Sequence, residues 1–273
     1  MKRPNADLYI VAAGNGSRLQ AGVPKALIPI KDEPCLSSTL KRIGRKFRRV
    51  FIATNVLVQD QWIAYFCDLG SRYPDLVPTI VNLPIESGLG DGHATLQAMT
   101  LAQKKLDPNE LSNDIVVAWG DVFFPHAEIV DEMLMIVPRG AGVVPAVFEP
   151  NPYVSLVVDR EMYCVAAEFS KLGERHSCGY HDQSIFRFDR LLLQRALIDI
   201  HSSLWRHRRY LSPHGEMSLL YSFHYLYNSN RPVYVYETSF PTLTFNTIEE
   251  VTSVKKEINC KLQQGIEIDR LPR

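Results

Sequence analysis

The stretch LYIVAAGNGSRLQAGVPK, from Leu8 to Lys25, decides the fold of this 273-residue chain. Its first residues, 8–13, are apolar and predict a buried strand. Gly14 and Gly16 follow, and glycines permit positive φ angles and let an anion approach successive backbone N–H groups. Arg18 and Lys25 add two cations to the same loop. The stretch therefore predicts a strand that ends in an anion-binding loop.

Two familiar phosphate-binding loops are excluded by the spacing of these residues. The dinucleotide fingerprint needs a third Gly or Ala where Leu19 stands, and the Walker loop needs Gly-Lys-Ser/Thr at its end. A glycine pair after a strand can also be a plain turn. The further spacing to Arg18 and to Pro24-Lys25 favours a loop that binds a phosphate chain.

Outward from this loop, apolar runs alternate with helical patterns through the first half of the chain. Strands are predicted at 50–54, 77–81 and 115–119, and helices around 36–43 and 93–105. Such alternation is typical of a mostly parallel sheet with helices on both faces.

The second half is less regular. Strands are predicted at 141–148, 155–158, 163–167, 184–188 and 233–236, and a helix at 192–200. Thr247 and Glu250 form a capping box at the start of a final helix that buries Val251, Val254, Ile258 and Leu262. There is no internal repeat or low-complexity linker, so we expect a single domain, 1–273, whose halves are 1–125 and 126–273.

The composition excludes several classes of protein. Hydrophobic residues make up 46% of the chain and charged residues 22%, as in ordinary globular proteins. Thirty basic and thirty acidic residues give a formal net charge of zero, which speaks against nucleic acid or an anionic membrane as partner. No apolar run approaches the ~18–20 residues of a membrane helix. The polar start and the five cysteines without a CxxC pair indicate a cytoplasmic protein with reduced thiols.

Four segments resemble, in order, the motifs of the nucleotidyltransferases that make nucleotide sugars. The closest subclass is the sugar-1-phosphate pyrophosphorylases, which include the uridylyltransferase domain of the N-acetylglucosamine-1-phosphate enzyme. The resemblance covers about residues 8 to 258. Its segments are Gly14-Asn15-Gly16-Ser17-Arg18 with Lys25, Gly90-Asp91-Gly92-His93-Ala94, Trp119-Gly120-Asp121, and Phe245-Asn246-Thr247-Ile248-Glu249-Glu250.

The resemblance implies a three-layer α/β/α Rossmann-like nucleotidyltransferase fold with a mixed, mostly parallel central sheet. Residues 1–125 would then bind the NTP, and 126–273 would bind the acceptor and supply the C-terminal helix. Arg18 would support the leaving pyrophosphate, and Lys25 would neutralise phosphate charge at the reacting centre. The implied nucleotide-binding residues are Ala12, Ala13, Gly14, Asn15, Gly16, Ser17, Gly90 and Asp91.

The implied cofactor is Mg²⁺, held by Asp121 and Asn246. Mg²⁺ prefers hard oxygen ligands and keeps several waters, so one carboxylate, one amide oxygen and phosphate oxygens suffice. Each residue also has a simpler interpretation. Asp121 can be the N-cap of a following helix, and Asn246 can be a turn residue before the final helix that begins at Thr247.

The acceptor side is implied by a further set of residues. Glu168 and Lys171 resemble the pair that holds the sugar phosphate, and His93 lies in the motif whose loop contacts base and sugar. Asp182 ends a stretch, 179–182, that stands where relatives usually carry Asn-Thr/Ser-Gly, so the contacts to sugar hydroxyls depart from the family pattern.

Asp91 stands where the uridylyltransferases usually have Thr. If its carboxylate faces the base, it can only accept hydrogen bonds, which favours the amino-bearing CTP or GTP over UTP. The alternative is that Asp91 accepts a hydrogen bond from a loop N–H.

The sequence thus predicts a Mg²⁺-dependent enzyme that transfers NMP from an NTP to a sugar-1-phosphate or a similar phosphorylated small molecule, as in the supply of nucleotide sugars for cell-surface polysaccharide. One alternative is a cytidylyltransferase for a non-sugar, phosphocholine-like acceptor. Another is a non-catalytic regulatory homologue that binds nucleotide. The sequence is compatible with a homo-oligomer. We expect no acetyltransferase segment of the kind found in bifunctional relatives.

Overall fold

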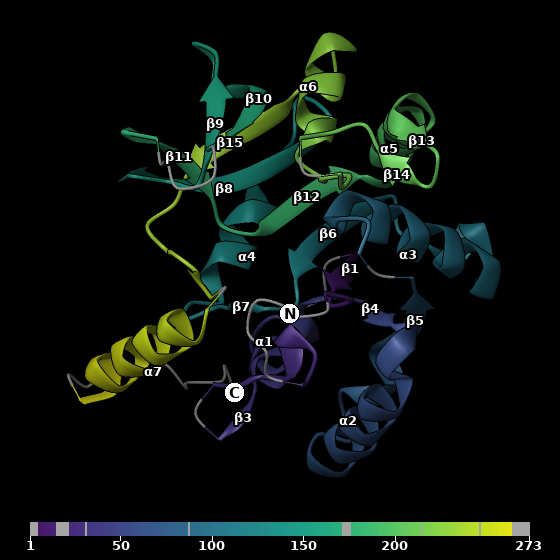
Figure 1. The fold of residues 1–273 in the computed structure, drawn as a ribbon, viewed down its shortest axis with the longest axis vertical. Helices are drawn as coiled ribbons and strands as arrows, with labels where there is room; N and C mark the ends of the chain where they lie inside the picture. Colours follow the sequence, from purple (N-terminus) through teal and green to yellow (C-terminus); the bar gives the residue numbers. More distant parts are fainter. Residues whose placement is uncertain are drawn as a thin grey trace.

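The computed structural model of the chain describes residues 5–14, 22–30, 32–86, 88–170, 176–213, 215–245 and 247–263. A ten-stranded sheet runs through the molecule (Figure 1). From one edge to the other its strands are β11 (Cys178–Asp182), β9 (Val154–Val158), β10 (Tyr163–Phe169), β15 (Val233–Glu237), β8 (Gly142–Pro150), β12 (Ile185–Asp189), β6 (Asp114–Trp119), β1 (Ala6–Val11), β4 (Arg49–Asn55) and β5 (Ile80–Ile85).

The sheet is mixed, and most of its strands run the same way, as predicted. β6, β1, β4 and β5 form a continuous parallel region, and β8 pairs in parallel with β15. The strands that run in the opposite direction are β12, β10 and β11. The strands predicted at 155–158 and 163–167 are present as β9 and β10, and they pair as an antiparallel hairpin.

Seven helices lie in the described part of the chain, and Figure 1 shows them around the sheet. They are α1 (Cys35–Arg42), α2 (Gln59–Arg72), α3 (Asp91–Lys105), α4 (Glu128–Met135), α5 (Arg190–Leu204), α6 (Tyr221–Asn228) and α7 (Ile248–Gln263). Two-residue strands complete the fold: β2 (Pro29–Ile30), β3 (Glu33–Pro34), β7 (Val122–Phe123), β13 (Trp205–Arg206), β14 (Arg209–Tyr210) and β16 (Leu243–Thr244). None of the described helices is both long and apolar enough to cross a membrane.

The alternation of side chains along β1 separates two buried clusters. Leu8 and Ile10 pack on one face with residues of α1, α2 and α4, whereas Tyr9 packs on the other face with residues of α3, α5 and α6. Successive side chains of a strand point to opposite faces, so a strand with apolar side chains on both faces is buried between two layers. This arrangement confirms the predicted three-layer α/β/α fold.

A third cluster holds the final helix against the rest of the molecule. Val251, Val254 and Ile258 of α7 pack with Phe123 of β7 and with Phe245. The predicted capping contact at the start of this helix is present, since the Glu250 N–H donates to Thr247 Oγ1 at 3.2 Å.

Some local predictions differ from the structure. The strand expected at 77–81 begins only at Ile80, because 77–79 form a 3₁₀ turn around Pro78, whose ring cannot donate a sheet hydrogen bond. The helix α2 lies in a segment where no element was predicted. Its buried residues Trp62, Tyr65 and Leu69 have helical spacing, which is the signal that identifies it.

Candidate active site

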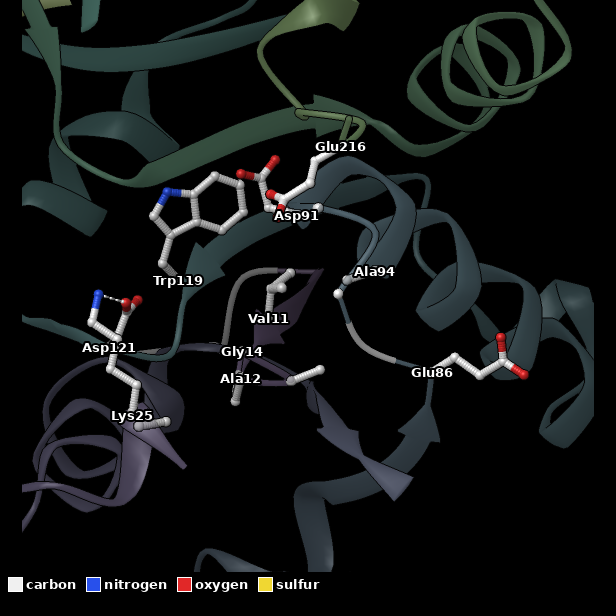
Figure 2. Close-up of a pocket in the computed structure, with 14 residues that line it drawn as sticks. Val11, Ala12, Gly14, Lys25, Glu86, Asp91, Ala94, Trp119, Asp121 and Glu216 are labelled. Carbon is white, nitrogen blue, oxygen red and sulfur yellow. Dashed lines mark ion pairs between the residues drawn. The ribbon is translucent and has the colours of Figure 1, made fainter. Parts of the chain in front are cut away.

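A cavity of about 310 Å³ opens at the carboxyl ends of β1 and β6, beside the start of α3 (Figure 2). Open α/β sheets bind ligands at this edge, where several strands end together. Residues from both halves of the chain line the cavity: Val11, Ala12, Ala13, Gly14, Lys25, Ala26, Glu86, Gly88, Gly90, Asp91, Ala94, Trp119, Asp121 and Glu216.

The loop after β1 meets the loop after β6 at close range. The Gly120 N–H donates to the Val11 carbonyl at 2.8 Å. A Cβ on Gly120 would lie 2.7 Å from the Ala12 Cβ, so only glycine permits this approach. The contact places Asp121 at the mouth of the first loop, where Gly14 is exposed. Asn15, Gly16, Ser17 and Arg18, the rest of the predicted phosphate loop, lie outside the described residues.

Lys25 and Asp121 form an ion pair in the wall of the cavity. Lys25 begins a 3₁₀ turn directly after Pro24. Its Nζ also lies 5.5 Å from the centre of the Phe245 ring, a distance at which a cation is attracted to an aromatic face. The structure thus brings together two predicted site residues that are far apart in the sequence. Asp121 is not the N-cap of a following helix, because α4 starts only after Ala127.

Of the two residues expected to hold the metal ion, only Asp121 is among the described residues. Asn246 lies outside the described residues, but the strand that ends just before it is placed. β16 pairs antiparallel with β7, and Thr244 lies opposite Val122, the residue after Asp121. Phe245 is fully buried. The chain therefore reaches position 246 from a strand that lies beside Asp121. Within the described residues, no group of three or more His, Cys, Asp or Glu side chains could hold a metal ion.

The second glycine motif packs backbone to backbone against the segment 216–219. Met217 N–H donates to the Leu89 carbonyl at 2.9 Å, and Gly92 N–H donates to the Met217 carbonyl at 2.8 Å. A Cβ on Gly90 would lie 2.4 Å from the Met217 carbonyl oxygen, and one on Gly92 would lie 2.7 Å from the Ser218 carbonyl carbon. Gly90 also has a φ of +94°. These glycines are required because the second half of the chain crosses the start of α3 at this point.

Asp91 uses its carboxylate to hold that segment. Its Oδ1 accepts hydrogen bonds from the Leu219 N–H and from the Ser218 hydroxyl. Burial raises the pKa of Asp91 to about 6, and the nearby charges of Asp182 and Glu216 act in the same direction. Of the two interpretations of Asp91, the contact to a loop N–H is the one that the structure contains. Asp91 still lines the cavity.

Glu216 is a cavity residue that no sequence motif indicated. It belongs to the irregular segment between β14 and α6, and its side chain is exposed toward the cavity near Asp91 (Figure 2). Within the described part of the chain, its carboxylate has no hydrogen bond or ion pair. Only the tertiary contact of 216–219 with α3 brings it to the site.

His93 does not line the cavity. Asp91 and Ala94, three residues apart on α3, face it, so the intervening His93 points toward α5. Its Nδ1 is hydrogen-bonded to the Tyr210 hydroxyl, and its ring stacks on Trp205 with centroids 6.1 Å apart. Burial lowers the pKa of His93. His93 therefore packs between α3 and the β13–β14 hairpin, and its predicted contact with the acceptor stays a prediction.

The other predicted acceptor residues are also outside the cavity lining. Glu168 is exposed on β10, where its carbonyl accepts a hydrogen bond from His176 Nε2 at 3.0 Å. Asp182 is buried at the end of β11 and accepts from the Ser184 N–H at 2.9 Å, and burial raises its pKa. Lys171 lies outside the described residues.

Residues 8–188 match the family described as the MobA-like NTP transferase domain. Among curated proteins, the chain is similar to the bifunctional protein GlmU of Thermotoga sp. strain RQ2, with 22% identity over 207 residues, 74% of this chain and 42% of that protein. It is also similar to GlmU of Ruegeria sp. strain TM1040, with 28% identity over 172 residues, 61% of this chain and 35% of that protein. The chain therefore spans less than half the length of these curated relatives.

Two solved structures of HddC from Yersinia pseudotuberculosis have the same fold. The first has a TM-score of 0.63 at 13% identity and covers 92% of this chain and 99% of that one. The second, described as complexed with GMP-PN, has a TM-score of 0.61 at 15% identity with the same coverage. At such identities the likeness shows the fold alone.

The family match extends from β1 to β12 and includes the first loop, the second glycine motif and Asp121. It confirms the resemblance of this chain to the nucleotidyltransferases that make nucleotide sugars. The chain belongs to the MobA-like NTP transferase domain family.

Proposed function

We propose that the protein transfers NMP from an NTP to a sugar-1-phosphate or a similar phosphorylated small molecule and releases pyrophosphate. The observation that carries this proposal is the cavity in which Lys25 and Asp121 stand beside the loop after β1. A cation and an acidic oxygen ligand at the end of a glycine loop are suited to a polyphosphate, and the family match independently indicates an NTP.

The reaction brings together two anions, so positioning and charge neutralisation supply most of the catalysis. A phosphate oxygen of the acceptor attacks the α-phosphorus of the NTP in line with the bond to the leaving pyrophosphate. Lys25 would bind the phosphate oxygens at the reacting centre, with Arg18 and the N–H groups of 14–17 on the leaving pyrophosphate. Asp121 releases Lys25 for this role when a phosphate takes its place in the ion pair.

The donor set fits Mg²⁺. Asp121 offers a partly exposed carboxylate in the cavity wall, and Asn246 follows the strand that lies beside it. One carboxylate, one amide and substrate phosphate oxygens match the oxygen preference of Mg²⁺. Bound there, the ion would offset phosphate charge and orient the triphosphate.

On the nucleotide side, Ala12, Ala13 and the backbone of Gly88 and Gly90 would enclose the base and ribose. We expect CTP or GTP to be preferred over UTP. The HddC structure described with GMP-PN supports including a guanine nucleotide in any test. The acceptor would be bound by residues of the second half, with Glu168, Lys171 and Asp182 as the candidates from the family pattern.

The proposed location is the cytoplasm. Cys35, Cys67, Cys164 and Cys178 are free thiols, and reduced thiols are typical of cytoplasmic proteins.

The decisive experiment measures pyrophosphate released from each of the four NTPs with Mg²⁺ and a panel of acceptors. Sugar-1-phosphates form one arm of the panel, and phosphocholine forms another that tests the non-sugar alternative. We expect turnover with at least one sugar-1-phosphate, and its abolition by EDTA. Turnover with phosphocholine alone would favour the cytidylyltransferase alternative. Tight NTP binding without turnover in any arm would favour the regulatory homologue.

A further inference from the structure

The peptide group between Glu216 and Met217 is held by two hydrogen bonds. Ser212 Oγ donates to the Glu216 carbonyl at 2.6 Å, and the adjacent Met217 N–H donates to the Leu89 carbonyl at 2.9 Å. The close packing on Gly90 and Gly92 fixes the same segment from the side of α3. The backbone that directs the Glu216 side chain toward the cavity is therefore fixed on its C-terminal side by these hydrogen bonds and by the packing against α3.

The other carboxylates that line the cavity either have partners or point away from the other lining residues. Asp91 accepts from Leu219 and Ser218, and Asp121 is paired with Lys25. In Figure 2 the side chain of Glu86 extends away from the other lining residues. Among the described residues that line the cavity, Glu216 thus offers a carboxylate that faces a ligand with its acceptor oxygens unused.

The position of Glu216 indicates which part of a nucleotide it would meet. Figure 2 shows Lys25 with Asp121 on one side of the cavity and Asp91 with Glu216 on another. If the phosphates bind near Lys25, as the proposed function requires, a second group must fill the side of Glu216. An anionic phosphate there would be repelled, whereas a neutral hydrogen-bond donor would be attracted.

We propose that Glu216 is the residue that selects the nucleobase, by accepting a hydrogen bond from an amino group on the base; this inference rests on the proposed function of the cavity. A carboxylate can only accept hydrogen bonds. Cytosine, adenine and guanine each carry an exocyclic amino group. Uracil turns two carbonyl oxygens and a single N–H to the same edge, and its oxygens would be repelled.

The size of the preference follows from the cost of an unmet hydrogen bond. A polar group that is buried without its partner loses about 1–3 kcal/mol, which corresponds to a roughly 5- to 150-fold change in affinity. We therefore expect an amino-bearing NTP, CTP or GTP first, to bind at least ~10-fold more tightly than UTP. The preference is assigned to Glu216 and not to Asp91, because Asp91 Oδ1 already accepts from the Leu219 N–H and the Ser218 hydroxyl, whereas both carboxylate oxygens of Glu216 are unused within the described residues.

Calorimetric binding of ATP, CTP, GTP and UTP in the presence of Mg²⁺ tests this without knowledge of the acceptor. The wild type should show the stated preference over UTP. Glu216→Gln replaces one oxygen by an amide NH₂ that can donate to a uracil oxygen, and it should reduce the preference by about 10-fold. Glu86→Gln is the matched control, since it removes the same charge from the cavity rim, and it should leave the ratio of the four affinities unchanged.

Three outcomes would overturn the inference. One is an unchanged ratio in Glu216→Gln together with an unchanged melting temperature. A second is an equal loss for all four NTPs together with lost discrimination against the 2′-deoxynucleotides, which would place Glu216 on the ribose. The third is the absence of NTP binding to the wild type, which would overturn the proposed function as well, whereas the first two leave it standing.

Discussion

The two ends of the cavity differ in how their charges are compensated. At one end Lys25 and Asp121 are paired with each other, and each could exchange its partner for a phosphate or a cation. At the other end Asp91 is tied to the backbone of Leu219, while Glu216 stands without a partner within the described residues. The first end suits a polyanion, and the second suits a neutral donor. A nucleotide, anionic at one end and neutral at the other, combines both.

The largest effect should come from the paired end. Lys25→Ala removes the ammonium that offsets phosphate charge and should lower kcat by about 10²–10³-fold with little change in the melting temperature. Lys46→Ala is the control, because Lys46 also forms an ion pair, with Asp131, but outside the cavity lining. Pyrophosphate release measures both. A near-normal kcat for Lys25→Ala at unchanged stability would remove Lys25 from the reacting centre.

The close approach that positions Asp121 can be broken at Gly120. In Gly120→Ala the new Cβ would lie 2.7 Å from the Ala12 Cβ and 3.1 Å from its Cα, so the two loops must separate, at a cost of about 1–3 kcal/mol. The comparison is Gly70→Ala in α2, where the new Cβ would find Val77 at 3.6 Å and the helix would gain up to about 1 kcal/mol. Denaturant unfolding should move in opposite directions for the two variants, and equal shifts would contradict the crowding at Gly120.

The buried carboxylate at the other end should be visible in the pH dependence of stability. Because the pKa of Asp91 is raised to about 6 in the folded protein, the native state binds more protons than the unfolded chain between about pH 4 and 6. The contribution of Asp91 to stability is therefore present below this window and declines as the pH rises through it. Asp91→Asn keeps an acceptor for the Leu219 N–H but cannot ionise.

Melting temperatures at pH 4.5 and pH 7.5 would measure this effect. The variant should gain roughly 4–8 °C relative to the wild type on going to the higher pH, the shift expected for a change of about 2 kcal/mol in a chain of this size. Identical pH profiles of the two proteins would show that the carboxylate is not buried in the way the structure describes.

The smallest effect on function is expected at His93, which lies next to this end but outside the cavity. His93→Gln loses the contact with Tyr210 and the stacking on Trp205, so stability should fall by about 1 kcal/mol while the KM for the acceptor stays within about 2-fold. Thermal melts measure the change in stability, and acceptor titrations measure the KM. A large rise in the acceptor KM at unchanged stability would return His93 to the acceptor site.

Much of the fold could be predicted from short-range pattern. The apolar run at β1, the alternation of strands and helices as far as β6 and the capping box of α7 are local signals, and each corresponds to an element of the structure. The helices α4 and α6 were missed because they are only two turns long, and a short apolar stretch does not distinguish a helix from a strand.

The candidate site, like the fold, has a part that the sequence predicts and a part that it does not. The meeting of Lys25 and Asp121 could be predicted because both residues occupy fixed positions in recognisable motifs, and the structure contains their ion pair. The direction in which the His93 side chain points could not be predicted from the sequence, because it depends on the rotation of α3 relative to the sheet.

By itself the sequence determined the strand β1 and the spacing of the glycines and cations that follow it along the chain, since hydrophobic periodicity and backbone freedom are properties of neighbouring residues. Only the tertiary structure decided the other end of the cavity. Met217 lies far along the chain from Gly90, and their backbones meet because no side chain stands between them. That contact commits Asp91 to the loop and brings Glu216 to the cavity. No local pattern carries this information, because the energy lies in packing and hydrogen bonds between segments that the fold alone makes neighbours.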